Sequence, residues 1–154
     1  MNSRKWLMKT EPDVYSIDDL ATQKRTPWEG IRNYQARNFM MKDMTIGDEV
    51  FIYHSNAKPP GIVGLARVCS KPYPDHFAWD DASKYFDPKS TKENPRWFMV
   101  DVEFVKKFDQ LISLEQLKED PELSNMMVTR KGSRLSIQPV EEHEFNYILR
   151  TFTK

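Results

Sequence analysis

The sequence predicts an α+β fold in which a mostly antiparallel sheet closes into a small barrel with several short helices around it. Three observations predict this class. Five or six segments have the alternation or β-branched composition of strands, and three or four have helical periodicity. The helical segments do not alternate regularly with the strands, which argues against a repeated β-α-β arrangement. Most strands follow one another through turns, as they do in antiparallel sheets and small barrels.

Length and composition predict a single domain over residues 1–154, because 154 residues can bury one core. The aromatic share of 12% predicts that this core is rich in rings. No apolar run reaches the length of a membrane span, and no secretory signal is visible at the start. Since Cys69 is the only cysteine, no internal disulfide can form. We therefore expect an intracellular monomer without a membrane partner.

The N-terminal elements follow from alternation and from a helix cap. Arg4–Lys9 alternates polar and apolar residues and is the first expected strand, which must end before Pro12. Ser16 is followed three positions later by Asp19, the spacing of a capping box. This predicts a short helix that begins after Ser16 and runs through Leu20.

The next three elements are a helix and two strands. Asn33–Met44 contains good helix formers with apolar residues at helical spacing. A Gly47-Asp48 turn then leads to Glu49–Ser55, whose apolar and aromatic run predicts a strand. After the turn at Lys58–Gly61, Ile62–Ser70 is apolar at odd and even positions alike. That pattern predicts a strand in a sheet covered on both faces.

The C-terminal half begins with a long connection. Pro72–Pro95 is rich in Pro, Asp and Tyr and is too long for an ordinary connection, so we expect a functional loop. Trp97–Phe108 is the longest expected strand, with Phe98, Val100, Val102 and Phe104 on its apolar face. We then expect a capped helix, a last strand and an amphipathic closing helix, at Ser113–Asp120, Leu135–Val140 and Phe145–Phe152.

The stretch Trp28–Arg37 is the most informative for function. It joins an expected loop to an expected helix and combines two aromatic rings, two guanidinium groups and side-chain amides with one glycine, Gly30. A large flat ring beside amide and guanidinium donors suits a planar ligand with polar edges, such as a nucleobase. The alternative, which the residues leave open, is that Trp28 and Tyr34 are ordinary core aromatics.

Charge is balanced over the whole chain but uneven along it. There are 23 basic and 23 acidic residues, so no overall field draws the protein to polyanions. Residues 124–140, however, contain three bases and no acid, and residues 22–44 contain five bases and two acids. These segments could form a basic face opposed by an acidic one, but a plain solvated surface is the favoured interpretation unless the two basic segments are neighbours. The residues expected to hold phosphates are Arg32, Arg130, Lys131 and Arg134.

Seven motifs occur together along the chain: Trp6–Pro12, Trp28–Asn38, Tyr53–Ser55, Gly61–Gly64, Tyr73–Asp75, Asn94–Trp97 and Arg134–Pro139. In this order they resemble the EVE domain family, and most closely its thymocyte nuclear protein group. The resemblance covers the chain from Trp6 to the closing helix and implies a PUA-like barrel. It also implies a pocket for a modified base in DNA or RNA, with methylated or hydroxymethylated cytosine as suggested ligands.

The resemblance also bears on location. The chain departs from the thymocyte nuclear protein group in lacking a long basic N-terminal extension, which suits a bacterial or otherwise minimal version of the domain. We expect a cytoplasmic protein in a bacterium and a nuclear one in a eukaryote.

The proposed pocket has an aromatic part. Trp28 is expected to form one wall and Trp97 the facing wall, because Trp97 lies opposite the apolar stripe of its strand. Trp79, in the long loop, is a possible lid, and Trp6 is expected in the core with Met8. Stacking on such rings stabilises a bound base by about 1–3 kcal/mol.

The proposed pocket also needs polar groups that orient the base. Asn33 and Ser55 can donate and accept hydrogen bonds, and Lys9 and Glu11 are expected to pair at the rim. Because strand neighbours alternate, either Tyr53 or His54 must point outward. The full expected ligand-binding set is Lys9, Glu11, Trp28, Asn33, Tyr34, Tyr53, His54, Ser55, Trp79 and Trp97.

Two other classes of function remain open. A hydrolase acting on a modified nucleotide could use Cys69 as nucleophile, or a divalent ion held by Asp75, Asp80 and Asp81. Against this, Cys69 sits in an apolar strand, where an inert thiol is expected, and the three histidines lack zinc-site spacing. We expect no cofactor and no metal. The acidic segments and zero net charge also leave a protein-interaction module open.

Overall fold

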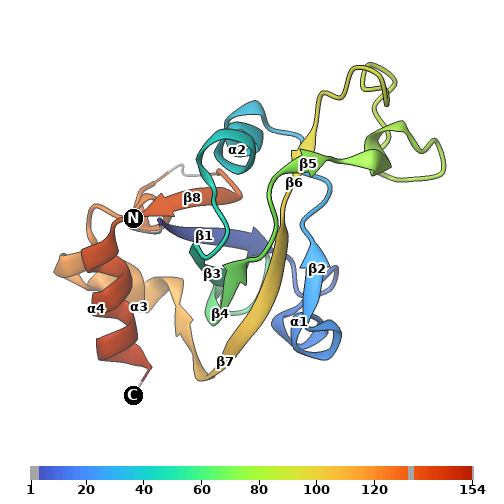
Figure 1. Ribbon diagram of the computed structural model, residues 1–154. Helices are drawn as coiled ribbons and strands as arrows, with labels where there is room; N and C mark the ends of the chain where they lie inside the picture. Colours follow the sequence, from blue (N-terminus) through green and yellow to red (C-terminus); the bar gives the residue numbers. More distant parts are fainter. Residues whose placement is uncertain (1–3, 132–133, 154) are drawn as a thin grey trace.

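Six strands form one curled sheet in the order β2-β7-β4-β3-β1-β8 in the computed structural model, which describes residues 4–131 and 134–153 (Figure 1). The strands are β1 (Lys5–Thr10), β2 (Arg25–Pro27), β3 (Glu49–His54), β4 (Gly61–Val68), β7 (Asp101–Ser113) and β8 (Ile137–Val140). A small second sheet pairs β5 (Tyr73–Pro74) with β6 (Phe98–Met99). The expected α+β class is therefore confirmed.

The large sheet is mostly antiparallel, as predicted, but it forms a half-barrel. Only β1 and β3 run parallel, and β2 and β8 stand at its two edges in the described residues. Each edge strand contains a proline, Pro27 or Pro139, which has no N–H to donate to a further strand. Both edge strands are also short. Strands β2 and β8 therefore do not pair with each other in the described residues, and the curled sheet stays open.

Irregular pairing between β4 and β7 accompanies the curl of the sheet. The pairing register shifts twice there, between Ile62 and Gly64 and between Leu65 and Ala66, and such bulges increase strand twist. The two backbones approach so closely that a Cβ on Gly61 would lie 2.3 Å from the Ile112 carbonyl oxygen. Glycine at this position thus permits the close approach of the two strands.

Both faces of the sheet are covered, and each has its own core. Trp6, Met8 and Ile52 belong to one cluster, while Leu7 and Phe51 belong to the other, so alternate residues of a strand enter opposite cores. This confirms Trp6 as a core residue. Helices α1 (Ile17–Gln23) and α2 (Tyr34–Asn38) contribute to the first core, and α3 (Leu114–Glu119) and α4 (Glu142–Phe152) to the second.

The helices begin largely where the sequence predicted. Ser16 and Asp19 form a capping box at α1, and Ser113 and Gln116 form one at α3. The expected helix Asn33–Met44 is instead two pieces, since α2 continues into a π-helical turn, η1 (Phe39–Asp43). Short 3₁₀ helices occur at His76–Trp79 (η2), Pro121–Leu123 (η3) and Met127–Thr129 (η4). No described helix is long and apolar enough to cross a membrane.

Two expectations about strands need correction. The predicted strand Trp97–Phe108 is interrupted at Val100, because its first residues pair with β5 while β7 pairs with β2 and β4. Strand β2 was not predicted, since three residues that end in proline carry no alternation. The long connection between β5 and β6 extends away from the large sheet, as Figure 1 shows.

Candidate ligand-binding cleft

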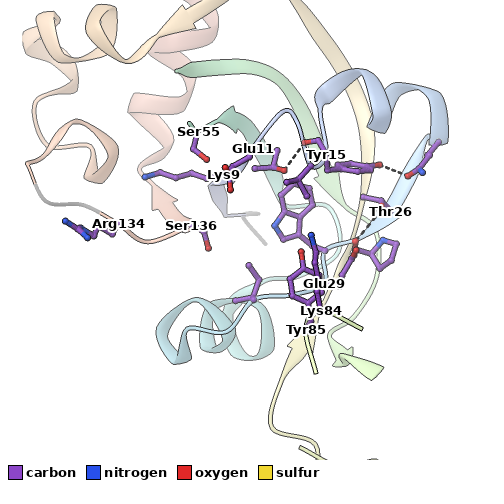
Figure 2. Close-up of a pocket in the computed structure, with 17 residues that line it drawn as sticks. Lys9, Glu11, Tyr15, Thr26, Glu29, Ser55, Lys84, Tyr85, Arg134 and Ser136 are labelled. Atoms are coloured by element: carbon purple, nitrogen blue, oxygen red, sulfur yellow. Dashed lines mark hydrogen bonds between the residues drawn. The ribbon is translucent and has the colours of Figure 1, made fainter. Parts of the chain in front are cut away.

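A cleft of about 900 Å³ lies where the parallel strands β1 and β3 end (Figure 2). Backbone hydrogen bonds extend β1 on both sides here: the Lys9 N–H donates to the Ser136 carbonyl at 2.7 Å, and the Ser55 N–H donates to the Thr10 carbonyl at 3.0 Å. These bonds bring Ser136 and Ser55 to the cleft wall. The cleft is lined by Lys9, Thr10, Glu11, Val14, Tyr15, Gln23, Thr26, Pro27, Trp28, Glu29, Gly30, Ile31, Ser55, Lys84, Tyr85, Arg134 and Ser136.

Trp28 is the indole of this cleft. It lies on the loop between β2 and α2, and its backbone N–H donates to the Val100 carbonyl at 2.8 Å. Only 8% of Trp28 is exposed, because one side belongs to the core while the residue also lines the cleft. Tyr15 meets it edge to face with ring centroids 6.4 Å apart. The two readings of Trp28 left open by the sequence, core and pocket, therefore both apply.

Ionisable groups of both signs line the cleft. Burial raises the pKa of Glu29 and lowers the pKa of Lys9. Figure 2 shows Glu29, Lys84 and Tyr85 together at one end, with Lys9 and Ser136 lying between them and Arg134. The cleft can thus accept and donate hydrogen bonds along its length, next to aromatic surface.

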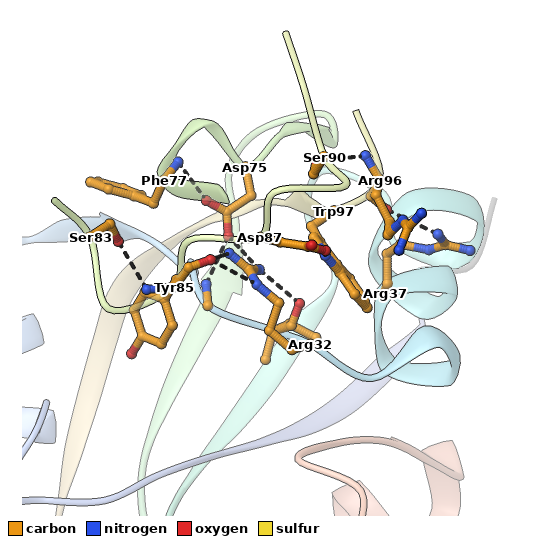
Figure 3. Close-up of polar contacts among 12 residues, drawn as sticks. Arg32, Arg37, Asp75, Phe77, Ser83, Tyr85, Asp87, Ser90, Arg96 and Trp97 are labelled. Atoms are coloured by element: carbon orange, nitrogen blue, oxygen red, sulfur yellow. Dashed lines mark hydrogen bonds and ion pairs between the residues drawn. The ribbon is translucent and has the colours of Figure 1, made fainter. Parts of the chain in front are cut away.

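A buried ion pair ties the long loop to the Trp28 loop (Figure 3). The fully buried Asp75 carboxylate accepts from Arg32 Nη1 at 3.1 Å and from the Gly30 N–H at 2.8 Å. Arg32 Nη2 donates to the Tyr85 carbonyl at 2.6 Å. Gly30 has a φ of +83°, and a Cβ there would lie 2.5 Å from the Tyr85 ring. This latch places Tyr85 beside the cleft.

The latch corrects the expected role of Arg32. Its guanidinium, predicted to hold phosphates, donates instead to Asp75 and to the carbonyls of Ile31 and Tyr85. With these donors already used, Arg32 serves as a positioning residue. The sequence also suggested the carboxylate of Asp75 as a metal ligand. This carboxylate is fully buried and already accepts hydrogen bonds from the protein.

Trp97 does not face Trp28 across the cleft, which corrects the expected pair of indoles. Trp97 is absent from the cleft lining, and its ring stacks on Tyr34 with centroids 4.8 Å apart. Its Nε1 donates to Asp87 at 2.7 Å. Tyr34 lies outside the cleft too, and is 52% exposed. Trp97 lies just before β6 and not within the strand that the sequence predicted, and the long loop and α2 supply its neighbours instead of the ligand cleft.

Four other expected ligand-binding residues lie outside the cleft lining. Asn33 caps α2, where its Oδ1 accepts from the Ala36 N–H at 3.0 Å. Tyr53 points into the second core and is 3% exposed. His54 Nε2 accepts from the Ile17 N–H at 3.1 Å and so caps α1. Trp79, the expected lid, lies in the 3₁₀ helix η2 without lining the cleft.

The rim residues are present but do not pair. Lys9 and Glu11 both line the cleft, yet Lys9 Nζ lies 5.6 Å from the Tyr53 ring centroid and Glu11 accepts from Asn56 at 2.8 Å. Ser55 lines the cleft as expected. Tyr15, Glu29 and Tyr85 were missed by sequence reasoning. The signal that could have pointed toward Tyr85 was Gly30, because its missing side chain leaves room for a neighbouring ring.

The basic side chains of residues 124–140 differ in position. Arg134 lines the cleft, whereas Arg130 and Lys131 are exposed and lie outside its lining. Residues 132–133 of this segment lie outside the described residues. The expected phosphate-binding role of these three side chains stays a prediction.

The residues suggested for an enzyme are placed elsewhere. Cys69 does not line the cleft, and burial raises the pKa of its thiol, which disfavours the reactive thiolate. Across residues 4–131 and 134–153, no group of three or more His, Cys, Asp or Glu side chains is arranged to hold a metal ion.

A curled, mostly antiparallel sheet whose loops surround an aromatic cleft of mixed charge defines an α+β protein with a candidate ligand-binding site. The model of the EVE domain family matches residues 4–151. The chain belongs to the EVE domain family.

Relatives support this membership over nearly the whole chain. Thymocyte nuclear protein 1 from Homo sapiens is 42% identical over 166 residues, which cover 96% of this chain and 73% of that protein. A hypothetical protein from Leishmania major is 50% identical, with a TM-score of 0.92 over 97% of this chain and 94% of that one. The human THYN1 protein in complex with DNA that contains 5-methylcytosine is 42% identical, with a TM-score of 0.91 over 99% of each chain.

Proposed function

We propose that this protein is a nucleic-acid-binding module that accepts one modified base, such as 5-methylcytosine, in the cleft beside Trp28. The cleft carries this proposal, because it places an indole, hydrogen-bonding side chains and Arg134 around one hollow of about 900 Å³. A relative 42% identical to the chain has been solved with DNA that contains 5-methylcytosine. DNA that contains 5-methylcytosine is therefore the first ligand to test.

Physical chemistry supports a base taken out of its stack. Extrusion of a base costs a few kcal/mol, and a stacking partner in the protein offsets about 1–3 kcal/mol of that cost. Trp28, Tyr15 and Tyr85 provide ring surface for this purpose. One methyl group adds only about 0.8 kcal/mol when it is buried, so the preference for a marked base over its parent should be modest.

The finer features of the protein belong to the same proposal. The half-barrel is proposed to be a PUA-like barrel, as the EVE resemblance implies, within a single domain over residues 1–154. We propose that it acts without catalysis as a monomer, on DNA or RNA, in the bacterial cytoplasm or the eukaryotic nucleus. The positions of Cys69 and Asp75 support a binding role, since neither lies in the cleft lining.

Replacement of Trp28 by leucine tests the proposal. Trp28→Leu keeps an apolar side chain toward the core but removes the ring, so we expect affinity for a 5-methylcytosine oligonucleotide to fall by about 5- to 150-fold, the equivalent of 1–3 kcal/mol of stacking. Fluorescence polarisation with a labelled oligonucleotide measures this, and thermal unfolding of each variant verifies the fold.

Trp97→Leu is the matched control, because Trp97 is a similarly buried indole, 6% exposed, that does not line the cleft. It should destabilise the protein while leaving affinity within about two-fold of the original, a small change on the scale of one stacking contact. An unchanged affinity in a folded Trp28→Leu variant would remove Trp28 from the site. Mass spectrometry of the same mixtures should show the modified base intact, and a converted base would favour the hydrolase.

A further inference from the structure

Lys9 brings a positive charge into the cleft. It lies near the end of β1, and its side chain is only partly exposed where it lines the cleft. None of the ion pairs among residues 4–131 and 134–153 uses its ammonium group. Glu11 lines the cleft too, but its carboxylate accepts from Asn56 at 2.8 Å. The Lys9 charge lies instead over the Tyr53 ring, with 5.6 Å between Nζ and the ring centroid.

A lysine in this position has a strong attraction for an anion. Burial lowers the pKa of Lys9, because the ammonium group loses water and no carboxylate compensates for the loss. Charged groups that are taken out of water are ordinarily paired with the opposite charge. A negatively charged group of a ligand would supply that pairing.

Two serine side chains accompany Lys9 from the segments on either side of β1. The Lys9 N–H donates to the Ser136 carbonyl at 2.7 Å, and the Thr10 carbonyl accepts from the Ser55 N–H at 3.0 Å. Ser55 and Ser136 line the cleft with Lys9. Ammonium and hydroxyl groups are donors with which proteins hold the phosphate oxygens of nucleic acids. This end of the cleft therefore has the donors that a phosphate requires.

The two ends of the cleft differ in what they can bind. Figure 2 shows the Lys9 side chain pointing away from Glu29 and toward the side on which Arg134 lies. A phosphate is attracted to the end with Lys9 and Arg134, whereas an ionised Glu29 carboxylate would repel it. The volume of about 900 Å³ lies in the range of sites that enclose whole small molecules, so the cleft has room for a nucleotide and not only for its base.

We propose that Lys9, together with Ser55 and Ser136, binds the phosphate of the nucleotide whose base lies beside Trp28. This inference rests on the proposed function of the cleft and adds to it the direction in which the nucleotide lies. The base occupies the end with Trp28, and the phosphate occupies the end with Lys9. The contact is therefore made only when that base has entered the cleft.

The test replaces one phosphate at a time. Oligonucleotides with a single 5-methylcytosine carry a methylphosphonate, which has no negative charge, immediately before or immediately after the modified nucleotide. We expect one of these replacements to weaken binding to the unmodified protein by about 10- to 150-fold, the loss that corresponds to one hydrogen bond with a charged group. Fluorescence polarisation measures each affinity.

Variants of Lys9 show whether this side chain reads the charge. Lys9→Met and Lys9→Gln are neutral and of similar length, so the same methylphosphonate should cost them little. Lys9→Arg keeps the charge and should keep most of the sensitivity. Ser55→Ala with Ser136→Ala should reduce the penalty in part. Lys106→Met, at an exposed position of β7 outside the cleft lining, is the control and should respond like the unmodified protein. Thermal unfolding verifies the fold of each variant.

The outcomes distinguish this inference from the function on which it rests. If neither methylphosphonate weakens binding to the unmodified protein, the cleft binds a base but holds no phosphate of that nucleotide. If the replacement weakens the unmodified protein and a folded neutral Lys9 variant by the same factor, Lys9 does not contact the phosphate, and the inference is overturned. If the unmodified protein binds no oligonucleotide, the proposed function fails and the inference falls with it.

Discussion

At the scale of single residues, the carboxylate of Asp75 connects the two loops beside the cleft. It is fully buried and accepts from the backbone N–H groups of Gly30 and Phe77 as well as from Arg32. Each bond joins the long loop to itself or to the Trp28 loop. A buried carboxylate is tolerated in this place because every bond supplies partial or full positive charge.

We expect Asp75→Ala to lower the free energy of unfolding by about 2–3 kcal/mol. The value is at or below the lower end for breaking a buried ion pair, because 24% of the Arg32 side chain is exposed. Chemical denaturation of Asp75→Ala, Arg32→Ala and the double variant would give the coupling between the two residues. Asp81→Ala, an exposed aspartate of the same loop, is the control and should be nearly neutral. Additive effects of the two single changes would show that the pair does not act as a unit.

At the scale of secondary-structure elements, the start of α1 depends on a residue far along the chain. Ser16 and Asp19 satisfy part of the helix terminus by themselves, and His54 accepts the remaining Ile17 N–H from the end of β3. Only a neutral imidazole nitrogen can accept that bond. Burial lowers the pKa of His54, which agrees with this neutral state.

The His54 cap predicts a pH dependence of stability. Because the pKa of His54 is lower in the folded protein than its ordinary value of 6.5, the unfolded chain binds the proton more readily. The contribution of His54 to the free energy of unfolding is constant above about pH 6.5. It declines as pH falls through that value, until the folded histidine is itself protonated.

Unfolding by urea at several pH values, compared between the unmodified protein and His54→Gln, measures the contribution as a difference. The glutamine oxygen can still accept from Ile17, and it does not titrate. His143→Gln, an exposed histidine in α4, should retain the pH dependence. A His54→Gln profile that follows the unmodified protein between pH 5 and 7 would contradict the assignment.

At the scale of the whole molecule, zero net charge means that any attraction to nucleic acid must be local. In the basic stretch of residues 124–140, Arg134 lies at the cleft and Arg130 is exposed. Contacts of such side chains with phosphates release counterions, so the logarithm of affinity falls linearly with the logarithm of salt concentration.

The double variant Arg130→Ala, Arg134→Ala should therefore bind more weakly to every sequence and show a smaller salt slope. Two lost contacts correspond to a reduction of about 1.8 for duplex DNA and about 1.4 for a single strand. Titrations between 50 and 200 mM salt, a range over which counterion release is readily measured, would show it. Lys106→Ala with Lys118→Ala removes two exposed bases from β7 and α3 and is the matched control. An unaltered slope would remove the two arginines from the phosphate contacts.

Local patterns in the sequence predicted most of the helices and strands and the loop that carries Trp28. The Ser16 and Ser113 caps, the alternation of Trp6 and Met8, and the two-sided burial of β4 follow from local rules, because each depends on residues close in the chain. Trp28 could likewise be assigned to a loop before the helix expected from Asn33 onward.

Only the tertiary structure decided which side chains share the cleft. The alternation of residues along the predicted strand could not show that Tyr34 and Asp87 cover Trp97. Tyr85 reaches the cleft because Arg32 and Asp75 fold the long loop back against Gly30. These partners lie more than 40 residues apart in sequence. Periodicity describes the faces of one element, whereas the packing between distant segments determines what each face meets.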